Sequence, residues 1–164
     1  MSTNYITEEK LAEIKSQLAK LIDVERPQVL EELKYARSLG DLSENADYDS
    51  AKMRQEQLEK KISELEYILK NYEIIDKGNK EGKEAGKEQK VVKIGSKVRV
   101  FHSLTNEEYT FEILGSLDAN PSQFKISNES PIARAILGKP AGGTYTVEVE
   151  TRQKSYSIKV LEIF

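Results

Sequence analysis

Residues 40–49 read GDLSENADYD, and the rest of the chain is organised around this stretch. Gly40 suits the end of a helix, because a residue without a Cβ adopts the left-handed conformation of a C-cap at no steric cost. A second helix is predicted to start at once, since Asp41 and Glu44 have capping-box spacing and Ser43 is a rival cap. The stretch therefore predicts the tip of a helical hairpin that carries a cluster of carboxylates.

Apolar residues recur at three- and four-residue spacing on both sides of this tip, as in amphipathic helices. The first helix is expected to open at Thr7 and to be kinked or broken near Pro27, which removes a hydrogen bond and clashes with the preceding turn. The second is expected to run from Glu44 to Tyr72, a rod of about 43 Å. Its apolar seam consists of Tyr48, Ala51, Gln55, Leu58, Ile62, Leu65, Leu69 and Tyr72. Residues 1–76 thus predict an antiparallel coiled-coil hairpin.

The second half of the chain has a different pattern. Residues 77–90 contain three glycines and eight charges, and we interpret them as a flexible charged linker. Beyond them the apolar period is two, which predicts strands at residues 98–100, 109–114, 124–126, 144–149 and 156–163. One short helix is expected between the third and fourth strands, with Ser130 as cap, Pro131 in the first turn and Gly138 as terminator. Residues 91–164 therefore predict a small antiparallel β domain with a single helix, and the fold class is α+β.

Composition excludes several kinds of self-contained active site. The 164 residues include no cysteine and one histidine, His102, so disulfides, thiolate metal sites and cysteine nucleophiles are excluded. No Ser/His/Asp arrangement or glycine-rich phosphate loop is evident. No apolar run approaches the roughly 18 residues of a membrane span, and the N-terminus lacks the apolar core of a signal peptide, so we expect a cytoplasmic protein with no membrane partner. The absence of a self-contained active site therefore favours a protein that alters the activity of another protein complex.

The charge is unevenly distributed. Residues 1–76 contain 17 acidic and 11 basic residues, a net charge of −6. Because phosphate affinity comes from clustered Lys and Arg, this half is a poor stand-alone nucleic-acid binder. If it contacts nucleic acid, it is expected to do so with the help of another protein.

The tip carboxylates are the strongest candidates for chemistry. Asp41 and Glu44 are three residues apart at a predicted helix start, so both can face the same side. Their oxygens suit Mg²⁺, but two carboxylates on an open tip cannot hold a hydrated ion firmly alone. They could complete a site whose other ligands come from a partner or from substrate phosphates, where a second metal ion raises the rate of phosphoryl chemistry. The alternative is that Asp41 only caps the helix and Glu44 completes the capping box.

Three cations flank the tip. Arg37 lies about one turn before it, and Lys52 and Arg54 lie about two turns after it on the opposing helix. Together they could form a small basic patch suited to a nucleic-acid backbone, with little sequence preference. The alternative is ordinary helix-surface charge, for instance Lys52 paired with Glu56.

Two stretches resemble the signatures of a known family. Residues 40–48, followed by Ala51 and Lys52, resemble the tip signature of the bacterial GreA/GreB transcript cleavage factors. Residues 130–139 (SPIARAILGK) are similar to that family's second signature. Both occur in the right order on a chain of the right length, and the modest basic patch is nearer to GreA than to GreB.

This resemblance implies a function. The coiled coil would enter the secondary channel of RNA polymerase, and an FKBP-like C-terminal domain would dock on the channel rim. In backtracked complexes Asp41 and Glu44 would help to hold the second catalytic Mg²⁺ and position water, and Ser43 would orient that water. Arg37 and Lys52 would guide the extruded RNA 3′ end. The chain would then be no enzyme and would bind no cofactor stably; it would act as a monomer, sharing Mg²⁺ with the polymerase.

The resemblance also implies a docking loop. Residues 117–121 (LDANP) fall where the family commonly has a more acidic loop, and Asn120 replaces what is often Asp. Asp118, Asn120 and Ser122 are therefore predicted partner contacts, with docking either weaker here or compensated elsewhere.

Three rival functions are weighed against this one. A channel-binding antagonist of the same fold would not support cleavage, and the intact pair of Asp41 and Glu44 argues against it. A prolyl isomerase would need an aromatic-lined pocket, whereas the aromatic residues of the second half are mostly spaced as strand core. A purely structural coiled-coil protein would keep its function when Asp41 and Glu44 are replaced by Ala.

Overall fold

The computed structural model describes residues 3–40, 45–75, 90–151 and 154–164. The chain divides into two compact units. Glu9–Tyr72 forms the hairpin unit, and the first eight residues join Glu73–Phe164 in the β unit. The predicted division kept residues 1–76 together, whereas the contacts group the N-terminal residues with the β unit. Most of the predicted linker 77–90 lies outside the described residues.

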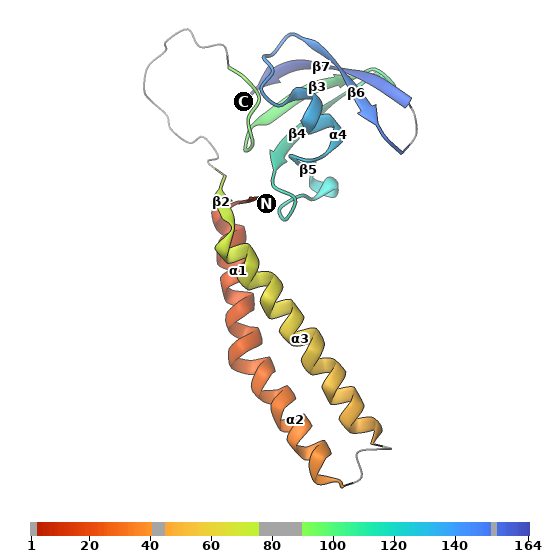
Figure 1. Cartoon of the computed structure of the whole chain (residues 1–164). Coiled ribbons are helices and arrows are strands. Elements are labelled where there is room, and N and C mark those ends of the chain that lie inside the picture. The colour runs from red at the N-terminus through yellow and green to blue at the C-terminus, as the bar shows by residue number, and fades with distance from the viewer. Residues whose placement is uncertain (1–2, 41–44, 76–89, 152–153) are drawn as a thin grey trace. The chain divides into compact units, whose positions relative to one another are not determined.

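The hairpin unit consists of two long helical arms side by side (Figure 1). The first arm comprises α1 (Glu8–Lys20), a π-helical segment η1 (Leu21–Glu25) and α2 (Arg26–Ser38); the second is α3 (Ala46–Lys70). Side chains at helical spacing bury one face of each arm, and the buried cluster between them consists of Leu21, Val29, Leu33, Ala51, Leu58 and Ile62. Each fully buried Leu or Ile contributes about 1.5–3 kcal/mol. The predicted apolar seam is confirmed at Ala51, Leu58 and Ile62, with Tyr48 and Leu65 partly buried against them. Its last member, Tyr72, lies beyond the end of α3 and is exposed.

The α-helical pattern of the first arm changes next to Pro27, as predicted, but the arm remains helical through this point. Pro27 lies in the first turn of α2, directly after the π-helical turn Leu21–Glu25. A proline ring clashes with the carbonyl four residues before it, and a wider π-turn relieves that clash while the helix continues. Beside this segment Arg26 spans the two arms, its Nε and Nη2 donating to Oε1 and Oε2 of Glu59 at 2.8 and 2.7 Å.

The core of the β unit is a five-stranded sheet with the order β5-β4-β3-β7-β6. Its strands are β3 (Lys97–His102), β4 (Glu107–Leu114), β5 (Lys125–Ser127), β6 (Thr144–Val149) and β7 (Lys154–Ile163). One helix, α4 (Pro131–Ile136), lies against it (Figure 1). The shared core comprises Val92, Val98, Val100, Ile113, Ala133, Ile136, Val147, Ile158, Val160 and Ile163. The predicted strands and single helix are confirmed.

The sheet is mixed, not wholly antiparallel as expected, because β5 runs parallel to β4. Between them the chain passes through a 3-10 helix, η2 (Pro121–Gln123), and turns at Phe124, whose φ is +55°. The Phe124 carbonyl then accepts from the amide of Glu112 at 2.9 Å, at the start of β5. A period of two indicates which residues share a face of a strand, but it carries no information on strand direction.

A separate two-stranded sheet pairs β1 (Asn4–Ile6) with β2 (Tyr72–Ile74). The sequence pattern gave no signal for β1. Ile6 at the end of β1 is fully buried. Among the helices in the described ranges, none is both long and apolar enough to cross a membrane.

Candidate functional site

The two helix ends at the hairpin tip are joined by one side chain. Gly40 follows α2 with φ at +101°, the left-handed conformation predicted for it. Asn45 is the N-cap of α3: its Oδ1 accepts from the amide of Tyr48 at 3.1 Å, and its Nδ2 donates to the carbonyl of Ala36 at 2.7 Å. One amide therefore satisfies a free N–H of α3 and adds a second hydrogen bond to a carbonyl of α2, which also accepts from the amide of Leu39 at 3.3 Å.

The predicted helix start is therefore wrong by a few residues. We expected Asp41 or Ser43 to cap the second helix, but α3 begins at Ala46 behind the Asn45 cap. Asn is among the best N-cap residues, so the sequence did contain this signal. The capping-box spacing of Asp41 and Glu44 was given more weight in the prediction. Glu44 precedes the cap in sequence, so it cannot be the third helical residue of a capping box. Asp41, Ser43 and Glu44 themselves lie outside the described residues.

The three predicted phosphate-binding cations do not share one face. The Cζ atom of Arg37 lies 5.8 Å from the centroid of the Tyr48 ring, a cation–π distance. Lys52 follows Tyr48 by four residues, so the two side chains point to one side of α3. On that side the Nζ of Lys52 donates to Oε1 of Gln55 at 3.3 Å. We call this side, defined by Arg37, Tyr48 and Lys52, the Arg37–Lys52 face.

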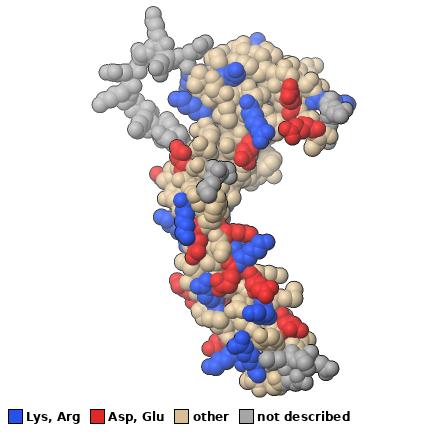
Figure 2. All heavy atoms as spheres, viewed as in Figure 1, with Lys and Arg blue, Asp and Glu red and all other residues tan. Residues whose placement is uncertain are grey.

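Arg54 points elsewhere. It follows Lys52 by two residues, about 200° around the helix, so it leaves α3 on the opposite side. There its Nη1 donates to both carboxylate oxygens of Glu32 at 2.6 Å. Glu32 thus offsets the charge of Arg54. On the side of the hairpin seen in Figure 2, basic and acidic side chains are interspersed along both arms.

The predicted docking loop is tied into its own unit. Asp118 accepts two hydrogen bonds from Thr7, from the amide to Oδ2 at 2.8 Å and from Oγ1 to Oδ1 at 3.0 Å. Asn120 is the N-cap of η2 and accepts from the amide of Ser122 at 3.2 Å. Ser122 is exposed, and so is Phe124, which the sequence did not single out and whose side chain is 52% accessible.

The loop also begins with a close approach. A Cβ at Gly115 would lie 1.6 Å from the carbonyl oxygen of Tyr5 in β1, so no larger residue fits there without movement of the backbone. Together with the bonds from Thr7 to Asp118, this contact seats the N-terminal strand against residues 115–118. The sequence contained a glycine at this position but nothing to indicate what it would meet.

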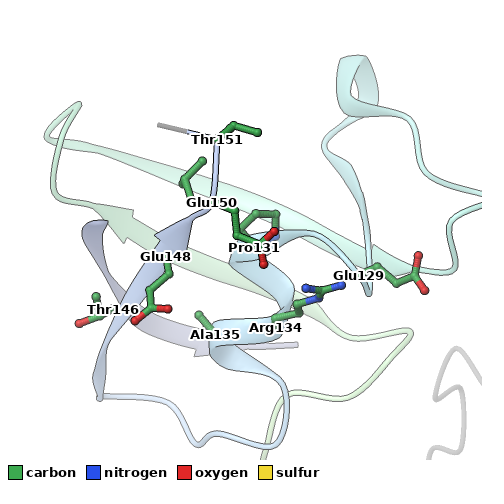
Figure 3. Close-up of a pocket in the computed structure, with 9 residues that line it drawn as sticks. Glu129, Pro131, Arg134, Ala135, Thr146, Glu148, Glu150 and Thr151 are labelled. Atoms are coloured by element: carbon green, nitrogen blue, oxygen red, sulfur yellow. The ribbon is translucent and has the colours of Figure 1, made fainter. Parts of the chain in front are cut away.

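Two further features of the described parts of the chain bear on function, their possible metal ligands and a pocket. Within these parts, no group of three or more His, Cys, Asp or Glu side chains is placed to hold a metal ion. A pocket of about 460 Å³ in the β unit is lined by Glu129, Pro131, Arg134, Ala135, Thr146, Glu148, Val149, Glu150 and Thr151 (Figure 3). This pocket has no aromatic lining, unlike the site that a prolyl isomerase would need.

Known proteins match nearly the whole chain. The sequence profile described as "Transcription elongation factor, N-terminal" matches residues 4–74, and the one described as "Transcription elongation factor, GreA/GreB, C-term" matches residues 87–163. Transcription elongation factor GreA of Mycoplasmopsis agalactiae is 47% identical over 159 residues, 97% of this chain and 92% of that protein. GreA of Mycoplasma capricolum is 44% identical over 158 residues, 96% of each chain.

A solved structure is also similar. Crystalline GreA factor homolog 1 (Gfh1) of Thermus thermophilus has a TM-score of 0.43 and 21% identity, over 99% of both chains. The two profile matches and the identities to GreA proteins together show that this chain belongs to the GreA/GreB family of transcription elongation factors.

Proposed function

We propose that this chain binds bacterial RNA polymerase, inserts its hairpin into the secondary channel and stimulates the polymerase's own cleavage of backtracked RNA, so that arrested complexes restart. Family membership supports the transcriptional role. The observation that carries the finer proposal is the cap of α3. Since Asn45 supplies it, Asp41 and Glu44 are not required as the capping box of this helix and are available for another task.

In this proposal the chain is a cofactor and the polymerase performs the reaction. Asp41 and Glu44 are hard oxygen donors, the type that Mg²⁺ prefers, and two of them suffice only where a partner supplies further ligands. In two-metal phosphoryl chemistry the ion that these carboxylates would help to hold would supply activation of the attacking water, and the other ion would supply stabilisation of the leaving oxygen. Ser43, between the two carboxylates in sequence, would orient that water.

The RNA 3′ end is proposed to lie along the Arg37–Lys52 face. Arg37 is held over the ring of Tyr48, and a planar guanidinium with an aromatic ring is suited to a nucleotide backbone and its bases. Arg54 is proposed to contribute least, because Glu32 already pairs with it on the other side of the hairpin.

Docking on the polymerase is assigned to the loop at residues 117–124. Ser122 is exposed and available to a partner, and Asn120 shapes the turn that presents it. Asp118 would contribute chiefly by anchoring this loop to Thr7. This division assigns binding to the β unit and catalytic assistance to the tip.

RNA cleavage in a stalled, backtracked elongation complex with Mg²⁺ tests the proposal. The comparison is no factor, the parent chain, Asp41→Asn, Glu44→Gln, and Asp49→Asn as a control that removes one carboxylate from the exposed first turn of α3. The parent and the control should stimulate cleavage, and the first two variants should not, while all bind polymerase alike. Equal stimulation by all chains would contradict the role of the tip, and slowed elongation without cleavage would indicate an antagonist.

A further inference from the structure

One edge of the five-stranded sheet is open. β6 is the last strand in the order β5-β4-β3-β7-β6, and it pairs only with β7 among the strands of the described residues. An edge strand presents main-chain N–H and C=O groups that can pair with another extended chain. α4 flanks this edge and leaves the pocket of Figure 3 between them.

The register shows which groups face outward. The amide of Val160 donates to the carbonyl of Gly143 at 3.0 Å, and Thr144 is paired with Lys159, so Thr144 is in a non-hydrogen-bonded pair with β7. Pairs alternate along an antiparallel ladder, so the main-chain groups of Thr146 and Glu148 also point away from β7. Both residues line the pocket. The two residues whose main-chain groups point away from β7 are therefore also residues of the pocket wall.

The charge of the pocket favours one class of ligand. Three carboxylates line it, those of Glu129, Glu148 and Glu150, against a single cation, Arg134. Among the described residues, none of the ion pairs involves any of these four side chains. Glu129 accepts one hydrogen bond, from Oγ of Ser116 at 3.0 Å. The excess of acid would repel nucleic-acid phosphates and attract Lys or Arg.

We propose that the β6 edge is a docking site for an extended, cationic segment of a partner protein. The segment would add as a strand, pairing its main chain with Thr146 and Glu148, and its Lys or Arg side chains would reach the carboxylates of Glu148 and Glu150. α4 would form the outer wall through Arg134 and Ala135. This site is separate from the tip and from the loop at residues 117–124, so it does not depend on the proposed function.

A competing account is that these charges only protect the edge. Charged residues and a covering helix are common devices against unwanted strand pairing. The two accounts differ in their consequence for a basic peptide, because a protected edge rejects every strand, whereas a docking edge binds the cationic one and rejects an acidic one.

The probe is a fluorescently labelled hexapeptide of sequence KVRVKV, titrated with the full chain and followed by anisotropy, with EVEVEV as the matched acidic peptide. Thr146→Pro removes one outward N–H while leaving the ladder with β7 intact, since proline is tolerated where the N–H faces outward on an edge strand. Glu148→Gln with Glu150→Gln removes the charge, and Glu56→Gln with Glu108→Gln is a control with the same net charge outside the pocket. Amide NMR spectra check that each variant is folded.

We expect saturable binding of KVRVKV, weakened about tenfold by the Glu148/Glu150 pair and by Thr146→Pro, and unchanged in the control pair. Amide shifts should be confined to residues 144–151 and to Arg134 and Ala135. Any of four results overturns the proposal: no saturable binding, equal binding of EVEVEV, an equal loss in the control pair, or indifference to Thr146→Pro. Binding of a single-stranded RNA at the same amides would also overturn it.

Discussion

The side-chain amide of Asn45 donates a hydrogen bond to the main-chain carbonyl of Ala36 at 2.7 Å, across the tip of the hairpin. The same side chain caps α3 through the amide of Tyr48. One side chain, which has no proposed catalytic role of its own, thus contacts both the last turn of α2 and the first turn of α3. We therefore predict that Asn45 is a positioning residue for the proposed carboxylates.

Two replacements of Asn45 distinguish the contributions of its two side-chain hydrogen bonds. Asn45→Asp keeps an N-cap acceptor but loses the donor to Ala36, whereas Asn45→Ala loses both. We expect Asn45→Ala to lower the free energy of unfolding of the hairpin by about 2 kcal/mol, and Asn45→Asp by about half of that. Thermal unfolding followed by helical circular dichroism measures both. Ser50→Ala, an exposed change near the start of α3, is the control, and identical curves for all four chains would contradict the role of Asn45.

The same variants bear on the cleavage assay. If Asn45 positions the tip, Asn45→Asp should raise the Mg²⁺ concentration needed for half-maximal cleavage at a temperature where the hairpin is fully folded. A merely structural role would leave that concentration unchanged.

Replacing Arg54 and replacing Lys52 should have different effects on RNA contact, although the two residues are only two positions apart. Lys52→Ala and Arg37→Ala should reduce photocrosslinking of the chain to a reactive RNA 3′ end, because these side chains lie on the Arg37–Lys52 face. Arg54→Ala should leave the crosslink intact and lower hairpin stability by at most about 1 kcal/mol, since its exposed pair with Glu32 is solvent-screened. Loss of the crosslink in Arg54→Ala alone would reverse the assignment of faces.

Asp118 should matter more for stability than for contact with a partner. Removing its carboxylate leaves the amide and hydroxyl of Thr7 without these two acceptors, and Thr7 is 4% exposed. Asp118→Ala should therefore lower the free energy of unfolding of the β unit by about 2–3 kcal/mol. Ser122→Ala is the matched change on the exposed part of the loop, and it should weaken polymerase binding without a change in unfolding by denaturant. Equal stability of the two variants would contradict this division.

Alkaline pH should destabilise the β unit through Tyr156. Burial raises the pKa of Tyr156 above its ordinary value of 10.0, and its ring lies 4.5 Å from the ring of His102. The folded state therefore favours the neutral phenol, and this contribution is fully present below about pH 10 and is lost as the pH rises through the folded-state pKa. Tyr156→Phe should make denaturant stability above about pH 10 less dependent on pH. An unchanged slope would show that other groups carry the alkaline loss.

The hairpin could be predicted because its determinants are local. Residues from Leu11 to Leu21 and from Tyr48 to Tyr72 repeat at helical spacing, and Gly40 between them is the residue type that a helix end requires. Ser130, Pro131 and Gly138 delimit α4 for the same reason. Periodicity and capping act within one or two turns of chain, so they can be read without knowledge of the fold.

The sequence by itself determined the α+β class, the two helical arms, most strands and the residue types at the tip. Only the tertiary structure decided that Asn45 also reaches the carbonyl of Ala36, that β5 runs parallel to β4, and that Glu32 pairs with Arg54. The bond from Thr7 to Asp118 joins residues 111 positions apart. Such contacts depend on which surfaces meet after folding. A local pattern of apolar and polar residues does not specify which residues far away in the sequence will be in contact.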